Sequence, residues 1–335
     1  METGSPAANR FLTHSAIYSS ELNEGVIKVR KGNSTLTDAK SSTWGIGIIG
    51  TGAVGCALAK GLTQAGHTLT ALVDKKPAVA RELAAELKLD HYAPTLDQIG
   101  PDTQILIVSV PDSQIPIVDH SIAKRLPKIR IKACVHTSGA LPGSSLSAVS
   151  AGGVRVASLH PLQTFASREK SPGLKNVFFA IEGDPAILER LEELVRQMGG
   201  IPVVIPSDGK ALYHAAAVFA SNFIPTLLRV STELLDSIGV SPEDSRKMLA
   251  PLMQQTIENC LRIGEISALT GPVARGDAQT IARHLDAIGK VNPSLLAIYR
   301  ILSLKTLELA QEKGLEEIRF NSIMEILQGN VTDGA

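Results

Sequence analysis

From Trp44 to Pro206 the chain alternates between short apolar runs and longer amphipathic segments. Runs rich in Ile, Val and Leu are typical of buried strands, and apolar residues three or four positions apart are typical of helices. The pattern predicts strands over 44–50, 67–74, 103–110, 131–139, 153–161, 176–184 and 201–206. It predicts helices over 53–66, 77–89, 113–126 and 185–200. Strands that alternate with helices indicate an α/β fold with a doubly wound parallel sheet.

After Pro206 only the helical period remains, which predicts an all-α second half. The expected helices cover 210–239, 241–264, 277–290, 293–314 and 315–329. Pro225 predicts a bend or an interruption of the first of them. Ser241 and Asp277 are predicted to cap two others. We therefore expect a sheet domain over 44–205 and a helical domain over 206–330, while residues 1–43, which show no sustained period, are expected to form a disordered or non-domain extension.

Composition narrows the class of protein. Lys plus Arg equals Asp plus Glu, at 33 each, so we expect no nucleic-acid partner. Three widely spaced cysteines give neither a disulfide framework nor a zinc motif, which favours a cytoplasmic location. No uninterrupted apolar run approaches the roughly 20 residues that cross a bilayer, so no membrane association is expected.

Three glycines lie between the first strand and the first helix, in the order Gly50-x-Gly52-x-x-Gly55. Gly50 allows a tight turn, Gly52 lets a pyrophosphate approach the backbone, and Gly55 lets helix and strand pack closely. The free N–H groups at the start of the helix favour phosphate. The loop therefore predicts a Rossmann-type dinucleotide site, with Thr51, Ala53 and Val54 among its binding residues.

Two features at the end of the second strand point to different cofactors. Asp74 can bind ribose hydroxyls, and its charge would repel the 2′-phosphate of NADP. Lys75 and Lys76 follow and would attract that phosphate. The residues alone leave NAD and NADP open.

Further candidates stand where strands end, because ligands of doubly wound sheets bind at the carboxyl ends of strands. His136 and His160 each end a predicted strand, although either could simply bond loop backbone. His136 is a predicted cofactor contact. Further predicted cofactor contacts are Ser109, Val110, Pro111 and Ser138, and Gln163 is a predicted substrate contact.

The helix after the sheet carries polar residues among Ala and Phe. At an α-helical period Lys210, His214, Ser221 and Asn222 form one stripe. Buried polar groups need partners, and a ligand or the backbone of the sheet domain would serve. Arg275, in the loop 268–277, could bind a carboxylate or stay solvated. His136, His160 and His214 lack metal-ligand spacing, so no metal is expected.

Four motifs resemble one known family. They are VHTSGAL at 135–141, SLHPLQTFA at 158–166, YHAAAVFASN at 213–222 and LTGPVARGD at 269–277. Together they resemble Rossmann-like proteins that carry a domain of unknown function 2520, within the 6-phosphogluconate-dehydrogenase-like superfamily. The resemblance covers Trp44 to about Ala310. It implies an NADP-type oxidoreductase and a homodimer paired through the helical domain.

Two wider likenesses suggest chemistry. HPLQTF is similar to the His-Pro-Met segment of prephenate dehydrogenases, and the spacing from His214 to Asn222 is similar to the Lys-to-Asn spacing of ketopantoate reductases. His214 would stand where those enzymes place a catalytic lysine.

The sequence thus predicts an NAD(P)-dependent oxidoreductase that transfers a hydride to or from a C=O or C=N group of a small carboxylate-bearing metabolite. His214 is the predicted general acid, with Lys210 as substitute. Asn222 would orient the substrate, and Ser221 would contact it. His160 and Arg275 would hold its carboxylate. Two alternatives stay open: a ketopantoate reductase of another type, and a dinucleotide-binding sensor without activity.

Overall fold

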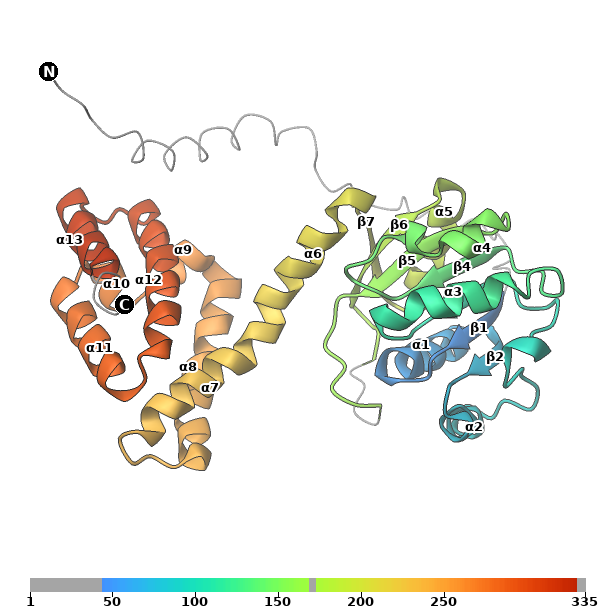
Figure 1. Cartoon of the computed structure of the whole chain (residues 1–335), viewed down its shortest axis with the longest axis horizontal. Coiled ribbons are helices and arrows are strands. Elements are labelled where there is room, and N and C mark those ends of the chain that lie inside the picture. The colour runs from blue at the N-terminus through green and yellow to red at the C-terminus, as the bar shows by residue number, and fades with distance from the viewer. Residues whose placement is uncertain (1–43, 169–172, 330–335) are drawn as a thin grey trace, which may run out of the picture. The chain divides into compact units, whose positions relative to one another are not determined.

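A computed structural model describes residues 44–168 and 173–329 of the chain. The predicted extension over residues 1–43 lies outside these ranges. Contacts between residues divide the chain into two units, with the division between Val218 and Phe219. Figure 1 shows the sheet in the first unit and the helices of the second.

Seven strands form one sheet in the order β2-β1-β3-β4-β5-β6-β7. The strands are β1 Gly45–Ile49, β2 Thr68–Val73, β3 Ile105–Val108, β4 Ala133–His136, β5 Arg155–Pro161, β6 Phe178–Gly183 and β7 Ile201–Val204. Strands β1 to β5 run parallel, as the alternation of strands and helices predicts. The doubly wound α/β fold is confirmed.

The sheet departs from the prediction at β6, which pairs with β5 in antiparallel register, Leu159 opposite Ile181. A parallel neighbour needs a crossover of a dozen or more residues, usually a helix. The described part of the β5–β6 connection contains no helix, so the chain returns in the opposite direction. Helix α5 then provides the crossover that makes β7 parallel to β6.

Helices cover both faces of this sheet (Figure 1). They are α1 Ala53–Gln64, α2 Pro77–Glu86, α3 Ile115–Ala123, α4 Ser147–Ala151 and α5 Pro185–Gln197. Helices α1, α2 and α5 pack with Ile46 and Ile48 in one apolar core. Helices α3 and α4 pack with Ile49 in the other. Neighbouring residues of β1 enter opposite cores because strand side chains alternate between the two faces.

One continuous helical stretch follows the sheet. Helix α6 Lys210–Ala217 passes into a π-helical turn, Val218–Asn222, and then into α7 Phe223–Asp236. The predicted irregularity thus lies just before Pro225. Proline has no N–H for the carbonyl four residues earlier, which is that of Ser221, so the helix is disturbed in the preceding turn.

The second unit is helical. Its remaining helices are α8 Pro242–Ile263, α9 Glu265–Ala268, α10 Pro272–Arg275, α11 Ala278–Val291, α12 Ser294–Glu312 and α13 Glu317–Gln328. A core joins α10 to α13 through Val273, Ile281 and Leu307, among others. The two predicted caps are confirmed: Ser241 accepts a hydrogen bond from the backbone of Asp244, and Asp277 accepts one from Thr280.

Among the described residues one helical stretch, Ser207–Asp236, is long and apolar enough, by length and composition, to cross a membrane. Polar residues such as His214 and Asn222 interrupt it, so a count of uninterrupted apolar residues does not find it.

Candidate functional site

The glycine loop between β1 and α1 has the geometry that a nucleotide site needs. Gly50 has φ +91°, and a Cβ there would lie 2.1 Å from the carbonyl oxygen of Ser109. A Cβ on Gly55 would lie 2.0 Å from the Gly50 oxygen. A Cβ on Gly52 would meet no described atom within 4 Å. Gly50 and Gly55 are therefore required by the fold, whereas Gly52 leaves open space above the start of α1, where phosphates bind in such folds.

The carboxylate of Asp74 bonds within the loop. One of its oxygens accepts hydrogen bonds from Thr51, at 2.7 Å from the backbone nitrogen and 3.0 Å from Oγ1. The other oxygen accepts one from the backbone of Lys76 at 2.9 Å. Burial opposes the charge, but these hydrogen bonds lower the pKa of Asp74 overall. Asp74 thus fixes the shape of the glycine loop, and both of its oxygens already have protein partners.

A cavity of about 380 Å³ lies at the carboxyl ends of the strands. We call it the crevice pocket. Its lining holds most of the predicted cofactor residues together with three predicted for catalysis or substrate. The residues are Gly52, Ala53, Val54, Ser109, Val110, Pro111, Asp112, Thr137, Ser138, Gly139, His160, Pro161, Gln163, Phe165 and His214. Lys75 is exposed and lies outside this lining.

Two imidazoles meet in the crevice pocket. The rings of His160, on β5, and His214, on α6, stand edge to face with centroids 6.0 Å apart. Nδ1 of His214 is buried and has no hydrogen-bond partner among the described residues. A Cβ at Gly139 would lie 2.6 Å from His214 Nδ1 and 2.9 Å from His160 Nε2. Only glycine leaves room for both rings, and an unpaired buried nitrogen is costly unless a ligand bonds to it.

Tyr213 orients one of these rings. Its hydroxyl lies 2.9 Å from Nδ1 of His160. Burial, with the charges of Lys210 and His214, lowers the pKa of His160 to about 4. Burial also raises the pKa of Tyr213 to about 12. At neutral pH the pair is therefore an uncharged imidazole and an uncharged phenol.

Lys210 lies behind the wall of the crevice pocket, with 1% of its surface exposed. Its ammonium donates to the backbone oxygen of Ser138 at 2.9 Å and to Oγ of Ser158 at 3.0 Å. Burial lowers its pKa to about 8, against the opposing effect of Glu182 and Asp112. Lys210, the predicted substitute for the general acid, thus anchors the loop that contains Ser138.

His136 supports the same loop. Its Nε2 lies 2.9 Å from the oxygen of Pro142, and its Nδ1 accepts from the backbone of Ser138. Oγ of Ser138 accepts in turn from the backbone of Leu141. Burial lowers the pKa of His136 and favours the neutral ring. Both ring nitrogens of His136 are hydrogen-bonded within the protein. Neither nitrogen is therefore free to make the cofactor contact predicted for this residue.

The other predicted site residues belong to the second unit. Ser221 and Asn222 are exposed in the π-helical turn, and the wider turn shifts them from the stripe that an α-helical period predicts. Arg275 is exposed at the end of α10, where it lines a separate cavity of about 330 Å³ with Lys313 and Arg319. None of the three is part of the lining of the crevice pocket.

Sequence reasoning did not select Gly139, Thr137, Tyr213 or Phe165, although all four stand inside the quoted motifs. Phe165 and Thr137 line the pocket, Gly139 gives room to its imidazoles, and Tyr213 bonds one of them. Each of these four residues lies within five positions of a predicted histidine in the sequence, and that proximity could have pointed to them.

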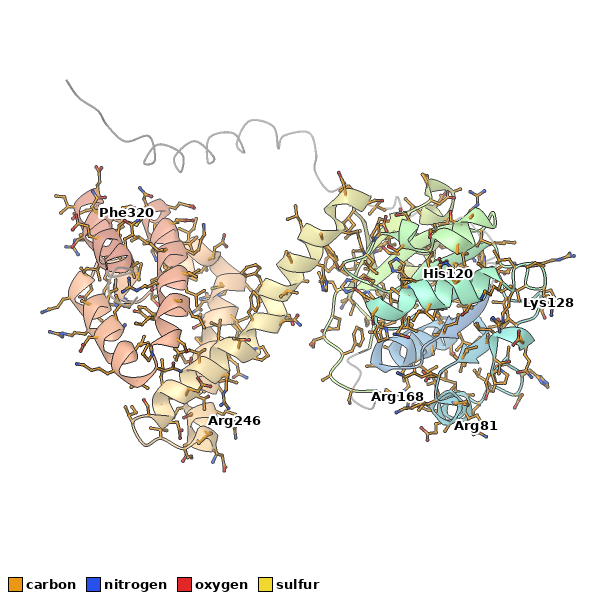
Figure 2. The ribbon with its side chains drawn as sticks, viewed as in Figure 1. Arg81, His120, Lys128, Arg168, Arg246 and Phe320 are labelled. Carbon is orange, nitrogen blue, oxygen red and sulfur yellow. The ribbon has the colours of Figure 1, made fainter. Side chains whose placement is uncertain are left out.

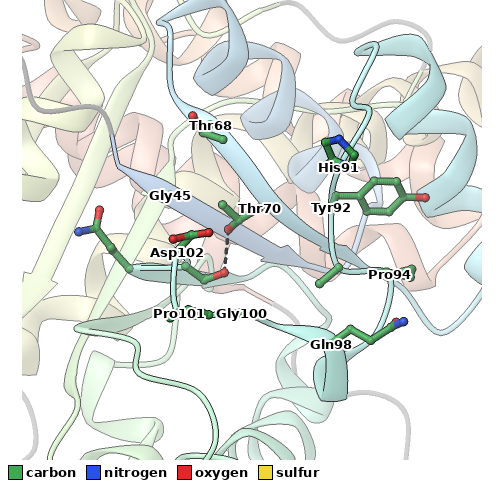
Figure 3. Close-up of a pocket in the computed structure, with 13 residues that line it drawn as sticks. Gly45, Thr68, Thr70, His91, Tyr92, Pro94, Gln98, Gly100, Pro101 and Asp102 are labelled. Atoms are coloured by element: carbon green, nitrogen blue, oxygen red, sulfur yellow. Dashed lines mark hydrogen bonds between the residues drawn. The ribbon is translucent and has the colours of Figure 1, made fainter.

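Other cavities and histidines of the described chain are less suited to binding a nucleotide or a reacting substrate. A larger hollow of about 700 Å³ lies at the amino ends of β1 and β2 (Figure 3). There the hydroxyls of Thr70 and Thr103 bond each other at 2.7 Å, and ligands of parallel sheets bind at the opposite ends of the strands. His120 lies exposed on α3 (Figure 2) and bonds the carbonyl of Pro116. Within residues 44–168 and 173–329, no three His, Cys, Asp or Glu side chains gather as metal ligands would.

Two family models match the chain. A Rossmann-like domain matches residues 30–161, and a domain of unknown function (DUF2520) matches residues 177–306. The two matches bear out the resemblance that the four motifs indicate.

Solved structures resemble the chain over most of its length. A Bacteroides fragilis protein provisionally named an NADP oxidoreductase is 26% identical, with a TM-score of 0.65, over 79% of this chain and 98% of that one. A Thermotoga maritima protein is 24% identical, with a TM-score of 0.64, over 80% and 99%. An imine reductase from Myxococcus stipitatus in complex with NADP⁺ shares the fold at 18% identity and a TM-score of 0.53, over 80% and 93%. A search of the curated proteins found no match.

Proposed function

We propose that the protein is an NADP(H)-dependent oxidoreductase that acts on a C=O or C=N group of a small metabolite. The observation that carries the proposal is the crevice pocket, which joins an open glycine loop to two imidazoles, one with an unpaired buried nitrogen. The Bacteroides fragilis relative and the imine reductase support NADP(H) as the cofactor. When bound, the nicotinamide supplies or takes the hydride, and the protein provides orientation and a proton.

The residues at the loop fit such a cofactor. Gly52 leaves space for a pyrophosphate, which the first N–H groups of α1 would bind. Thr51 and Lys76 donate three hydrogen bonds to the carboxylate of Asp74, which leaves it fewer free lone pairs for the ribose hydroxyls that would select NAD. Lys75 is exposed beside it and would attract a 2′-phosphate. Ser109, Val110 and Pro111 would line the ribose side.

The imidazoles stand where a substrate would react. An imidazole can give a proton to a forming alkoxide or amine, which is the role the sequence assigns to His214. The predictions for Asn222 and Arg275 stay predictions, since neither lines the crevice pocket. A cytoplasmic location fits the free thiols of Cys56, Cys134 and Cys260.

The proposal is tested by titrating the purified chain with NADPH and with NADH while following the fluorescence of the nicotinamide. We expect NADPH to bind at least about tenfold more tightly, since Lys75 would pair with its 2′-phosphate. Gly52→Ala should weaken NADPH binding at least about tenfold without lowering the melting temperature, because its Cβ enters open space that the pyrophosphate needs.

Gly100→Ala is the matched control, since a Cβ there also meets nothing within 4 Å but lies far from the glycine loop in sequence. Failure of the folded protein to bind either nucleotide would end the oxidoreductase proposal.

Two alternatives are separated by simple assays. The ketopantoate reductase hypothesis rests on the spacing from His214 to Asn222, and the π-helical turn Val218–Asn222 alters that spacing. NADPH oxidation on adding ketopantoate would support it. Tight NADPH binding with no turnover across a broad set of carbonyls and imines would favour a sensor.

We also propose that the helical unit pairs two copies of the chain. Phe219, Phe223 and Leu227 are exposed at four-residue spacing, and Phe219 is 71% exposed. Met248 and Leu252, one turn apart on α8, are 57% and 63% exposed. Monomers seldom expose apolar patches of this kind, and a second copy would cover them.

Sedimentation velocity should therefore give a dimer for the wild type and a monomer for Leu252→Glu, because a buried unpaired carboxylate opposes association. Arg246→Glu should remain dimeric, because six residues place Arg246 about 120° around the same helix from Leu252. A monomeric wild type at micromolar concentration would refute the proposal.

A further inference from the structure

We propose that Tyr213 holds His160 in the tautomer whose Nε2 carries the hydrogen, so that this ring offers the crevice pocket a hydrogen-bond donor and selects a carbonyl substrate over an iminium. The inference rests on the proposed function and narrows it to one substrate class.

One hydrogen lies between Tyr213 and His160. Their rings stand edge to face with centroids 5.6 Å apart, and the phenol oxygen lies 2.9 Å from Nδ1. Both groups are uncharged at neutral pH. The phenol makes no other hydrogen bond among the described residues, and donation of its hydrogen to Nδ1 is the arrangement proposed. A neutral imidazole carries one hydrogen, which then sits on Nε2.

The Nε2 atom of His160 lies beside Gly139 at the crevice pocket. Nε2 of His160 lies 2.9 Å from the place that a Cβ on Gly139 would take, and both residues line the crevice pocket. The missing Cβ of Gly139 leaves this nitrogen open to the cavity. Nδ1 of His214 lies beside the same place and also lacks a protein partner.

The charge around this N–H group determines which substrate it favours. The lining of the crevice pocket includes no Lys or Arg, and its one carboxylate, Asp112, is exposed. The nearby ammonium of Lys210 is bonded to Ser138 and Ser158 behind the wall. His160 therefore acts as an uncharged donor, and an uncharged N–H pairs with an acceptor.

A carbonyl oxygen is such an acceptor, and its negative charge grows as a hydride reaches the carbon, so the hydrogen bond strengthens in the transition state. An iminium nitrogen that carries a hydrogen is a cation and itself a donor, so the same N–H would oppose it. As the new C–H bond forms, the π electron pair of C=O moves to oxygen. The oxygen takes the Nε2 proton, Nδ1 takes the Tyr213 proton, and solvent returns a proton to the phenol oxygen.

His160 is then the catalytic residue, in place of the predicted His214, and Tyr213 is a positioning residue that acts through it.

The tautomer of His160 can be observed without turnover. In protein labelled with ¹⁵N-histidine, long-range proton–nitrogen correlations distinguish the Nε2–H ring from the Nδ1–H ring, and the His160 signals are assigned by their loss in His160→Gln. We expect Nε2–H in the wild type and a mixture of tautomers in Tyr213→Phe.

Tyr299 provides a matched control. Its hydroxyl lies 2.7 Å from Nδ1 of His284, with ring centroids 5.8 Å apart, in the second unit. Tyr299→Phe removes the same kind of bond and should leave the His160 signals and the turnover unchanged.

Activity completes the test. Matched pairs of ketones and cyclic imines are offered with NADPH, and we expect kcat/KM to favour the ketone at least about tenfold. Tyr213→Phe should lower kcat for the ketone about tenfold or more and leave the KM for NADPH unchanged. An Nδ1–H or charged His160 in a protein that binds NADPH, or faster reduction of the imine, would overturn this inference alone. Failure to bind NADPH would overturn the proposed function and the substrate class with it.

Discussion

Gly139→Ala should lower turnover about 100-fold or more while the protein keeps its fold. The added Cβ would lie 2.6 Å from Nδ1 of His214 and 2.9 Å from Nε2 of His160, closer than such atoms pack. The backbone at this glycine does not have positive φ, so alanine causes no strain there. The two rings must give way, and misplacing a catalytic group by about 1 Å can cost about 100-fold in rate.

The measurement is NADPH oxidation with the carbonyl compound that reacts best with the wild type, together with the melting temperature. Gly289→Ala is a suitable control because its Cβ would meet only Leu296 at 3.6 Å, an ordinary contact. Turnover within about twofold of the wild type in a folded Gly139→Ala protein would mean that the two imidazoles do not face the reacting atoms.

The order of strands and helices could be predicted because each element carries its own period, and the glycine loop because its turn, space and packing are local requirements. A Cβ at Gly50 or Gly55 would collide with a backbone oxygen, so glycine is needed at both positions and their spacing can be recognised in the sequence. The direction of β6 was not predictable in this way. The apolar pattern of β6 is the same in either direction. The direction of the strand follows from the β5–β6 connection, whose described part contains no crossover helix.

The site shows the same division. His160 and His214 could be selected because one ends a strand and the other interrupts an apolar helix. The partnership of His160 with Tyr213 joins residues 53 positions apart and depends on where α6 begins relative to β5. Asp74 follows the second strand as predicted, but its carboxylate turns back to Thr51, which no spacing rule anticipates. The π-helical turn likewise breaks the period that placed Asn222 beside His214.

Lys210→Met should remove a pH dependence of stability worth about 3 kcal/mol in total. In the folded chain burial lowers the pKa of Lys210 to about 8, from an ordinary value of 10.5. Each pKa unit corresponds to about 1.4 kcal/mol. Below pH 8 both states hold the proton, and the fold bears the full cost of the buried charge. Between about pH 8 and 10.5 the unfolded chain binds more protons, so the free energy of unfolding rises with pH through this group.

The wild type should therefore gain stability relative to Lys210→Met as the pH rises from 7.5 to 10.5, as measured by urea unfolding at each pH. Lys313→Met is the control. Lys313 also donates to two carbonyl oxygens, of Ser267 and Leu269, but it is exposed, so water hydrates its charge in both states. Parallel pH profiles for the wild type and Lys210→Met would mean that the ammonium is hydrated in the folded chain. It would then not be the buried donor that fixes Ser138 and the loop beneath the two imidazoles.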